Sequence, residues 1–212
     1  MSAGVKDYAN LWSGEISIAN NGDGTINQTS TYWVASTSAN AISGVANIQI
    51  NDGTINMYTL GRSSDAGTAS IRNALSLKQY SKFEIAWCAT AYSDSSSSST
   101  GSFSITLTDA GSNNSTIISA ESAAVDNLVA GGGKLRIVYD GTNITITNLS
   151  TVAGTGSETI TNNSSVVVNV SSWSNVYLSF GISSGGDSTV TCEMKIYDAL
   201  VVDYFINSNK TQ

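Results

Sequence analysis

The chain has 212 residues, of which only 12% are charged, and it contains neither His nor Pro. Nine Lys and Arg stand against sixteen Asp and Glu, giving a net charge of −7. This acidity argues against nucleic acid as a partner, because phosphate binding needs a basic surface. The absence of His excludes a Ser-His-Asp triad and removes the commonest transition-metal ligand. No run approaches about 18 apolar residues, so we expect no membrane insertion.

Alternating apolar and polar residues predict an antiparallel β-structure. The clearest example is residues 48–57, in which Asp52-Gly53 separates two alternating runs. A period of two places apolar side chains on one face of a strand, and Asp-Gly favours the positive φ angles of a tight hairpin turn. The same dipeptide at Asp23-Gly24 and Asp140-Gly141 predicts similar corners.

In chain order, we expect residues 1–12 to form an N-terminal arm and residues 13–212 a single domain. Residues 93–100, rich in Ser, predict a surface loop. Residues 65–79 partly fit a helix, although their surroundings favour an extended segment, and only residues 120–128 favour a short helix. Strands are predicted at 15–19, 25–34, 45–50, 54–60, 82–92, 102–108, 134–139, 143–147, 165–170, 176–182 and 190–202.

The second half of the chain resembles the concanavalin A-like and laminin G-like β-sandwich superfamily. The segments that carry this resemblance are 77–87, 103–109, 134–146, 176–182 and 194–202. It implies an all-β fold, an antiparallel two-sheet jelly-roll sandwich with at most one short helix. Members of the superfamily include sugar-binding lectins, adhesion modules, glycoside hydrolases and surface domains of virions, so the resemblance implies a fold more than a function.

No catalytic constellation is recognisable, so we expect a protein that is not an enzyme. The hydrolases of this superfamily carry their carboxylates on one strand as Glu-x-Asp-x-(x)-Glu, and this chain has no such motif. Glu84 and Glu193 each stand alone on a strand, and Glu121 falls in the predicted helix. A hydrolase would need one of them to meet a second carboxylate in a cleft.

Sugar binding needs an aromatic surface beside amide and carboxylate groups. We predict glycan contacts at Tyr92 and Asp94, at the mouth of the Ser-rich loop, and at Asp109 and Asn113. For Trp33 and Trp173, which are further candidates, a place in the core is favoured.

We expect no metal and no other cofactor. Calcium is the alternative, because residues 20–25 and the group Asp109, Asn113 and Asn114 each offer oxygen ligands. Turn chemistry explains every residue in the first of these segments.

The resemblance also suggests a cysteine pair. In the related folds, the strand with Phe83 and the terminal strand with Ile196 are antiparallel neighbours. A register that pairs Phe83 with Tyr197 also pairs Cys88 with Cys192, so a disulfide is allowed in an oxidising compartment. No signal peptide is visible at the amino terminus, which favours two buried free thiols.

These observations lead to one hypothesis and one alternative. The hypothesis is a non-catalytic structural or binding module on a virus particle, such as a phage capsid decoration or tail component with a lectin-like fold, made in the host cytoplasm. Its partners would be other virion subunits or further copies of itself in a homo-oligomer, together with surface glycans. The alternative is an extracellular or cell-surface lectin that binds glycans through the loops at one rim.

Overall fold

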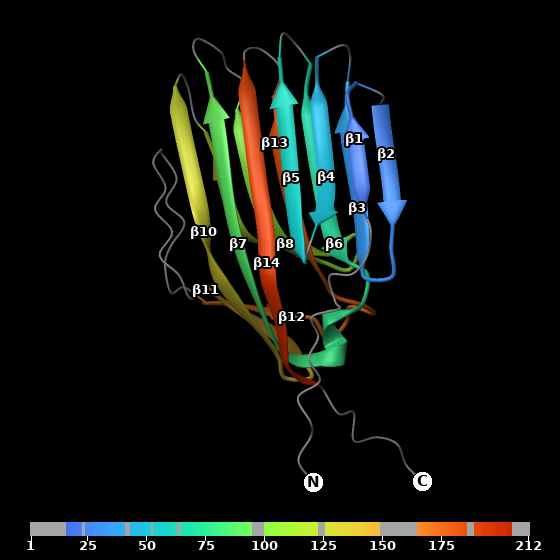
Figure 1. Cartoon of the computed structure of the whole chain (residues 1–212). Helices are drawn as coiled ribbons and strands as arrows, with labels where there is room; N and C mark the ends of the chain where they lie inside the picture. The colour runs from blue at the N-terminus through green and yellow to red at the C-terminus, as the bar shows by residue number, and fades with distance from the viewer. Residues whose placement is uncertain are drawn as a thin grey trace, which may run out of the picture.

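Two antiparallel β-sheets face each other in the computed structural model (Figure 1). The structure describes residues 16–22, 24–40, 43–51, 53–62, 65–94, 100–122, 126–148, 165–185 and 189–204. The order of the eight-stranded sheet is β1 (Ser17–Asn20), β4 (Val45–Asn51), β5 (Thr54–Gly61), β14 (Val190–Tyr204), β7 (Tyr80–Ser93), β10 (Asn127–Tyr139), β11 (Asn143–Asn148) and β12 (Ser165–Asn169). The order of the six-stranded sheet is β2 (Gly24–Thr29), β3 (Trp33–Ala39), β6 (Gly67–Asn73), β13 (Tyr177–Ser184), β8 (Gly101–Thr108) and β9 (Asn114–Glu121). The predicted antiparallel jelly-roll sandwich is confirmed.

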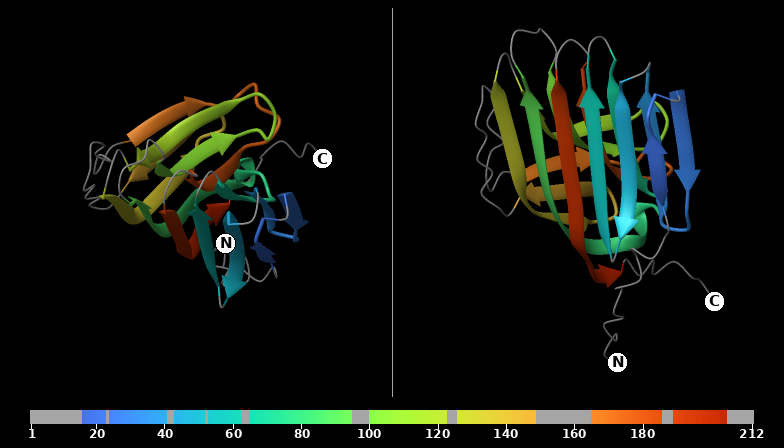
Figure 2. Two further views of the ribbon diagram at one scale, coloured as in Figure 1. Left: turned by 90° about the horizontal axis from the view of Figure 1, so that it is seen from above. Right: turned by 45° about the horizontal axis from the view of Figure 1, so that its top comes forward.

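The chain passes repeatedly from one sheet to the other. A 3₁₀-helix, Leu77–Gln79, leads from β6 into β7, and β13 and β14 likewise lie in different sheets. In Figure 1 the strands β10, β7, β14, β5 and β4 lie side by side across the front, with β13, β8 and β6 behind them. Figure 2 shows β11 and β12, in yellow and orange, steeply inclined to the upper halves of β7 and β14. The larger sheet is therefore strongly twisted.

The core lies between the sheets and follows from the alternation of each strand. Along β7, Ile85, Trp87 and Ala89 point inward and are buried, whereas Cys88 and Thr90 point outward and are exposed. The inward residues of β8 and β13 meet them from the other sheet, so that the ring centroids of Trp87 and Phe103 lie 5.9 Å apart. This packing fixes which side chains each sheet turns away from the core.

Two of the three Asp-Gly corners are hairpin turns, as predicted. Gly53 has a φ of 72° between β4 and β5, and Gly141 has a φ of 98° between β10 and β11. The third corner differs, because Gly24 begins β2 in the six-stranded sheet after β1 in the eight-stranded sheet. The same dipeptide there connects the two layers instead of closing a hairpin.

Several predicted elements need correction. The helix expected at residues 120–128 is wrong in its described part, because β9 continues to Glu121 and β10 begins at Asn127. The single strand expected at 25–34 is two strands, β2 and β3, separated by a turn. Residues 65–79 contain β6, in agreement with the extended interpretation. The expected arm at 1–12 and most of the Ser-rich loop lie outside the described residues.

Within the described part of the chain, no helix has the length and hydropathy of a membrane-spanning segment.

Candidate functional site: a groove across the eight-stranded sheet

A groove crosses the outward face of the eight-stranded sheet from β4 to β10, with a volume of about 630 Å³. Five neighbouring strands line it, and at roughly 4.8 Å between strands it spans about 19 Å. We call this feature the sheet groove. Its polar side chains are Asn47, Gln49, Asn56, Tyr58, Glu193 and Lys195, together with Cys88 and Thr90.

The strand register arranges these polar groups in two rows. In one row, Tyr58 pairs with Glu193, which in turn pairs with Thr90 on β7. In the next row, Asn56 pairs with Lys195, and Lys195 pairs with Cys88. Cross-strand neighbours on one face have Cβ atoms about 5 Å apart. A single extended ligand lying across the strands would therefore meet a phenol, a carboxylate, an ammonium group and several amides.

The hollow itself arises because the side chains of β7 and β10 are small at this level. Thr90 faces Ala130, and Cys88 faces Gly132. A Cβ atom added to Gly132 would come within 3.1 Å of the Cys88 Cβ and of the Trp87 carbonyl oxygen. The close contact between these strands thus depends on the glycine, and the larger residues of β5 and β14 form the other side of the groove.

Electrostatics keep the Tyr58 phenol neutral. Burial, and then the negative charge of Glu193, raise the pKa of Tyr58, while Arg62 opposes them. A neutral phenol both donates and accepts hydrogen bonds through its hydroxyl group. The side-chain amides of Asn47 and Asn56 donate through the NH₂ group and accept through the oxygen. The sheet groove therefore presents the mixed donors and acceptors that a ligand rich in hydroxyl groups requires.

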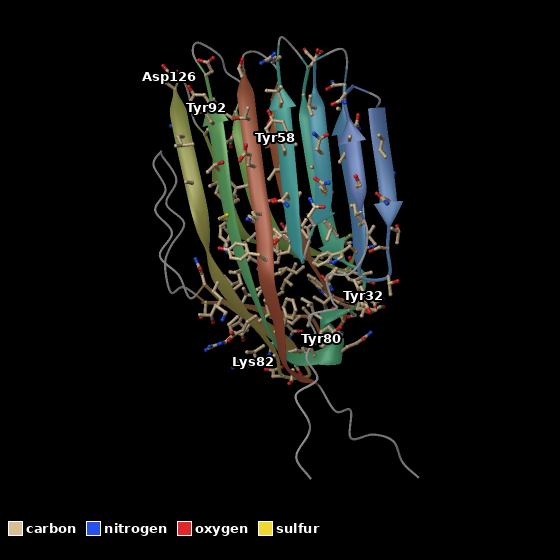
Figure 3. The ribbon with its side chains drawn as sticks, in the orientation of Figure 1. Tyr32, Tyr58, Tyr80, Lys82, Tyr92 and Asp126 are labelled. Atoms are coloured by element: carbon tan, nitrogen blue, oxygen red, sulfur yellow. The ribbon has the colours of Figure 1, made fainter. Side chains whose placement is uncertain are left out.

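Tyr92 and Asp94, predicted as glycan contacts, lie at the upper rim of this face. Tyr92 is two residues beyond Thr90 on the same side of β7, and its hydroxyl donates to the Asp126 carboxylate over 3.3 Å. Partial burial and the carboxylates of Asp126 and Asp94 raise the pKa of Tyr92. Figure 3 shows Tyr92 and Tyr58 in the upper half of the sheet. The predicted pair thus borders the groove without lining it.

Asp109 and Asn113 lie at the other end of the sandwich and are not brought together with Tyr92. They belong to the turn between β8 and β9, which follows the last residue of β8. The first residue of β8, Gly101, lies near Ser93, which follows Tyr92 at the end of β7, so the whole length of β8 separates the two predicted sites. Asp109 accepts bonds from the backbone of Gly111 at 2.7 Å and of Asn113 at 3.1 Å, and from the Asn113 amide at 2.7 Å. These bonds lower the pKa of Asp109. Its carboxylate stabilises its own turn.

The register that would pair Cys88 with Cys192 is wrong, and so is the expectation that both thiols are buried. The strands β7 and β14 are antiparallel neighbours, as expected, but Cys88 pairs with Lys195, and Cys192 pairs with Ala91. This register differs from the expected one by three residues, an odd number, so the two thiols lie on opposite faces of the sheet. Cys88 is exposed, and Cys192 is buried, both as free thiols. Burial raises the pKa of Cys192 to about 11.

Glu84 lies on the outward face of β7, below the groove, and is held by cations. The Lys134 ammonium lies 2.9 Å and the Arg136 Nε 2.8 Å from its carboxylate. The Lys134 hydrogen bond, and then that from Arg136, lower the pKa of Glu84 against the opposing effect of burial. A carboxylate held ionised in this way is poorly suited to donate a proton as a general acid.

Glu84 on β7 and Glu193 on β14, two carboxylates of the outward face, do not form a glycosidase pair. Thr90, opposite Glu193, is six residues along β7 from Glu84, which places the two residues about 20 Å apart along the sheet. Retaining and inverting glycosidases need carboxylate separations of about 5 and 6.5–9.5 Å. Glu121 lies on the other sheet, where it accepts a hydrogen bond from the Thr100 hydroxyl.

The other sequence candidates have structural roles. Trp33 and Trp173 are 4% and 9% exposed, which confirms their place in the core. Asn20, from the first calcium candidate, is buried and donates through Nδ2 to the Gly24 carbonyl at 2.8 Å. Among the described residues, no three His, Cys, Asp or Glu side chains gather as a metal site would require.

Sequence reasoning missed the sheet groove, although a signal was present. The amides Asn47, Gln49 and Asn56 occupy alternate positions of the hairpin that first indicated the fold. Their alternation with buried Ile and Met residues predicts that they share the outward face. Their partners on β14 and β7 could not be assigned without the register.

No family model and no curated protein matches this chain. Among solved structures, the family 11 xylanase from Neocallimastix patriciarum is similar at 12% identity, with a TM-score of 0.43 over 86% of this chain and 99% of that chain. The carbohydrate recognition domain of Emp46p in its potassium-bound form is similar at 10% identity, with a TM-score of 0.34 over 76% of this chain and 88% of that chain. At such values neither protein supports a functional conclusion, which must come from the groove.

Proposed function

We propose that the protein is a non-catalytic carbohydrate-binding module whose glycan lies across the strands in the sheet groove. The observation that carries this proposal is the double row of amide, phenol, carboxylate and ammonium groups beside a floor of small residues. Sugar hydroxyls both donate and accept hydrogen bonds, and amides and Tyr58 offer both functions. Glu193 accepts and Lys195 donates, so the hydrogen-bonding groups of a saccharide find complementary partners.

The separation of Glu84 from Glu193 along the sheet supports binding without hydrolysis. Glu193 is in the groove, but Glu84 is about 20 Å away along the sheet. The cationic neighbours of Glu84 lower its pKa and so favour its ionised form. A single carboxylate in this setting serves as a hydrogen-bond acceptor. We therefore expect the bound glycan to be released unchanged.

The test is a glycan array on the purified full chain, run with added calcium and again with a chelator. The proposal predicts reproducible binding that Tyr58→Ala abolishes, while the far-ultraviolet circular dichroism spectrum stays that of the unmodified protein. Tyr92→Ala should weaken binding less, because Tyr92 borders the groove. Absence of binding under both conditions would overturn the proposal, and loss with the chelator would reveal a metal requirement.

A second proposal concerns the setting in which the module works. We propose from the sequence that it belongs to the surface of a virus particle, in contact with other virion subunits or further copies of itself. Low charge and abundant Ser, Thr and Asn support close packing against neighbours. Detection of the protein in purified particles of its source tests this setting, and its absence from them would leave the extracellular lectin as the remaining alternative.

A further inference from the structure

A cationic cluster lies on the same outward face, directly below the sheet groove. Three of the nine Lys and Arg residues of the chain meet around Glu84, at 2.8 Å for Arg136, 2.9 Å for Lys134 and 4.0 Å for Lys82. Figure 3 shows Lys82 at the lower end of the sheet. Counted over the described side chains, three positive charges against one negative charge give this cluster a charge of +2, on a chain whose net charge is −7.

The cluster is continuous with the groove along β10. Ala130 and Gly132 face Thr90 and Cys88 at the groove floor, and Lys134 and Arg136 occupy the next outward positions of the strand. Outward positions are about 6.6 Å apart along a strand. Lys195, which pairs with Cys88 inside the groove, extends the positive charge upward. A glycan that fills the groove and turns along β10 would reach both cationic side chains.

The two cations remain accessible to a ligand even though they hold Glu84. The side chain of Glu84 is only 9% exposed, whereas those of Lys134 and Arg136 are 46% and 41% exposed. Arg136 bonds to Glu84 through Nε, which leaves the edge formed by its two Nη atoms as a second pair of donors for an oxyanion. Glu84 thus fixes the guanidinium in a position from which it can bind a second carboxylate or a sulfate in bidentate fashion.

We propose that the sheet groove takes an anionic polysaccharide, with its carboxylate or sulfate groups against Lys134 and Arg136. This inference rests on the proposed function and names the class of glycan. Among the side chains that the structure describes, Glu84 is the carboxylate that contacts these two residues, and Glu193 lies higher in the groove. Asp203 is in register with Lys82, so the proposal relies on Lys134 and Arg136 rather than on Lys82.

The experiment compares charged and neutral forms of one polymer by isothermal titration calorimetry on the full chain. Polygalacturonate and its fully methyl-esterified form share a backbone and differ in charge, while dextran sulfate and dextran separate sulfate from carboxylate recognition. The proposal predicts tighter binding of one charged form than of its neutral counterpart, and a preference that weakens as salt is added. Equal binding of the charged and neutral forms, or binding of neutral glycans alone, would overturn it.

Substitutions test whether the cluster is responsible. Arg136→Gln should weaken binding of the charged polymer about tenfold, the effect of losing a hydrogen bond between charged groups, and leave the neutral polymer unaffected. Arg72→Gln, which removes the same charge on the outward face of the six-stranded sheet, is the matched control and should change neither. Glu84→Gln keeps a side-chain oxygen that can accept from Arg136 and removes the competing negative charge, so it should strengthen binding of the charged polymer. Equal losses for Arg136→Gln and Arg72→Gln would contradict the proposal.

Two outcomes distinguish a failure of the preference for anionic glycans from a failure of the proposed carbohydrate binding. If neutral glycans bind and Ala130→Trp blocks them, the groove is a carbohydrate site, and only the preference for anionic glycans fails. If no polymer and no arrayed glycan binds, the proposed function fails, and the anionic specificity fails with it. Thermal unfolding of each variant shows whether a loss of binding reflects the contact or a loss of structure.

Discussion

The two outward faces of the sandwich are built alike but differ in chemistry. The eight-stranded sheet presents amides, Tyr58, Glu193 and Lys195 around a groove of about 630 Å³. The six-stranded sheet presents a smaller hollow of about 210 Å³, whose side chains are almost all hydroxyls: Ser36, Thr68, Ser70, Ser102, Ser104 and Ser183. Short hydroxyl groups offer little that projects toward a ligand. If the protein binds a glycan as proposed, this difference favours the larger sheet as the face that binds it.

The inward faces explain why the outward faces can diverge. In β8, Phe103, Ile105 and Leu107 alternate with Ser and Thr, and in β5, Ile55 and Met57 alternate with Asn56 and Tyr58. Packing between the sheets constrains the inward set in both strands, since interiors tolerate little change in volume. The outward set has no such constraint and is free to serve binding on one sheet only.

The comparison is tested most directly by filling each face with the same bulky residue. Ala130→Trp places an indole in the sheet groove opposite Thr90, and we expect it to abolish glycan binding because the small side chains there create the hollow. Thr106→Trp places the same side chain on the outward face of β8 and should leave binding unchanged. Calorimetric titration measures both, and binding lost equally in the two variants would show that the groove is not the site.

A second prediction concerns Glu84, whose counterpart is lacking on the six-stranded sheet. Glu84→Gln should lower the free energy of unfolding by about 1.5 kcal/mol at pH 7, since hydrogen bonds between charged groups are the stronger ones. Because Lys134 and Arg136 lower the folded pKa of Glu84, its stabilisation is complete above the unfolded value of about 4.3. That stabilisation is lost as the pH falls through the folded value.

The free energies of unfolding of Glu84→Gln and of the unmodified protein should therefore converge in strong acid. Urea denaturation at pH 7 and near pH 3 measures the difference at each. Glu121→Gln, which removes a carboxylate of the six-stranded sheet that accepts a hydrogen bond from the Thr100 hydroxyl, is the control and should show a smaller difference at pH 7. A constant difference between Glu84→Gln and the unmodified protein at both pH values would contradict the ion-pair interpretation.

The fold was largely predictable because most strands carry a period of two with strongly apolar inward residues. The strands that escaped prediction lack that contrast. The first half of β10 contains Gly131, Gly132 and Gly133, and β9 alternates small polar residues with few large apolar ones. Glycine and serine give little burial signal, so these strands form because their neighbours offer hydrogen bonds and not because of their own pattern.

The site was less predictable, because it depends on register between strands distant in sequence. The amides of β4 and β5 are close in the chain, but Glu193 and Lys195 reach them only through the pairing of β14. The expected pairing of β7 with β14 was in error by three residues, so that Cys88 lies in the groove beside Lys195 instead of opposite Cys192. Register is set by contacts along whole strands and by bulges, such as the irregularity between Tyr197 and Leu200.

The third prediction sharpens the comparison between the faces at the level of one hydroxyl. Tyr58→Phe removes the phenolic oxygen from the groove and should weaken glycan binding about fivefold, the effect of one neutral hydrogen bond. Tyr177→Phe, on the outward face of the six-stranded sheet beneath the Arg72 guanidinium, is the matched control and should leave affinity unchanged. Titrations of both variants with the same glycan decide between them. An equal change in affinity for the two would place Tyr58 outside the site.

The smallest expected effect on stability concerns Asp109, which the sequence predicted as a glycan contact and which lies in the turn between β8 and β9. Asp109 and Asp140 make the same bonds: each carboxylate accepts from the backbone two residues ahead and from the side chain of a following Asn. Asp109→Ala and Asp140→Ala should each lower the free energy of unfolding slightly and by similar amounts, because each removes the side-chain acceptor of an exposed turn. Neither should alter glycan affinity. If Asp109→Ala weakened binding while Asp140→Ala did not, the glycan would reach the lower end of the six-stranded sheet, and the contrast between the two faces would have to be redrawn.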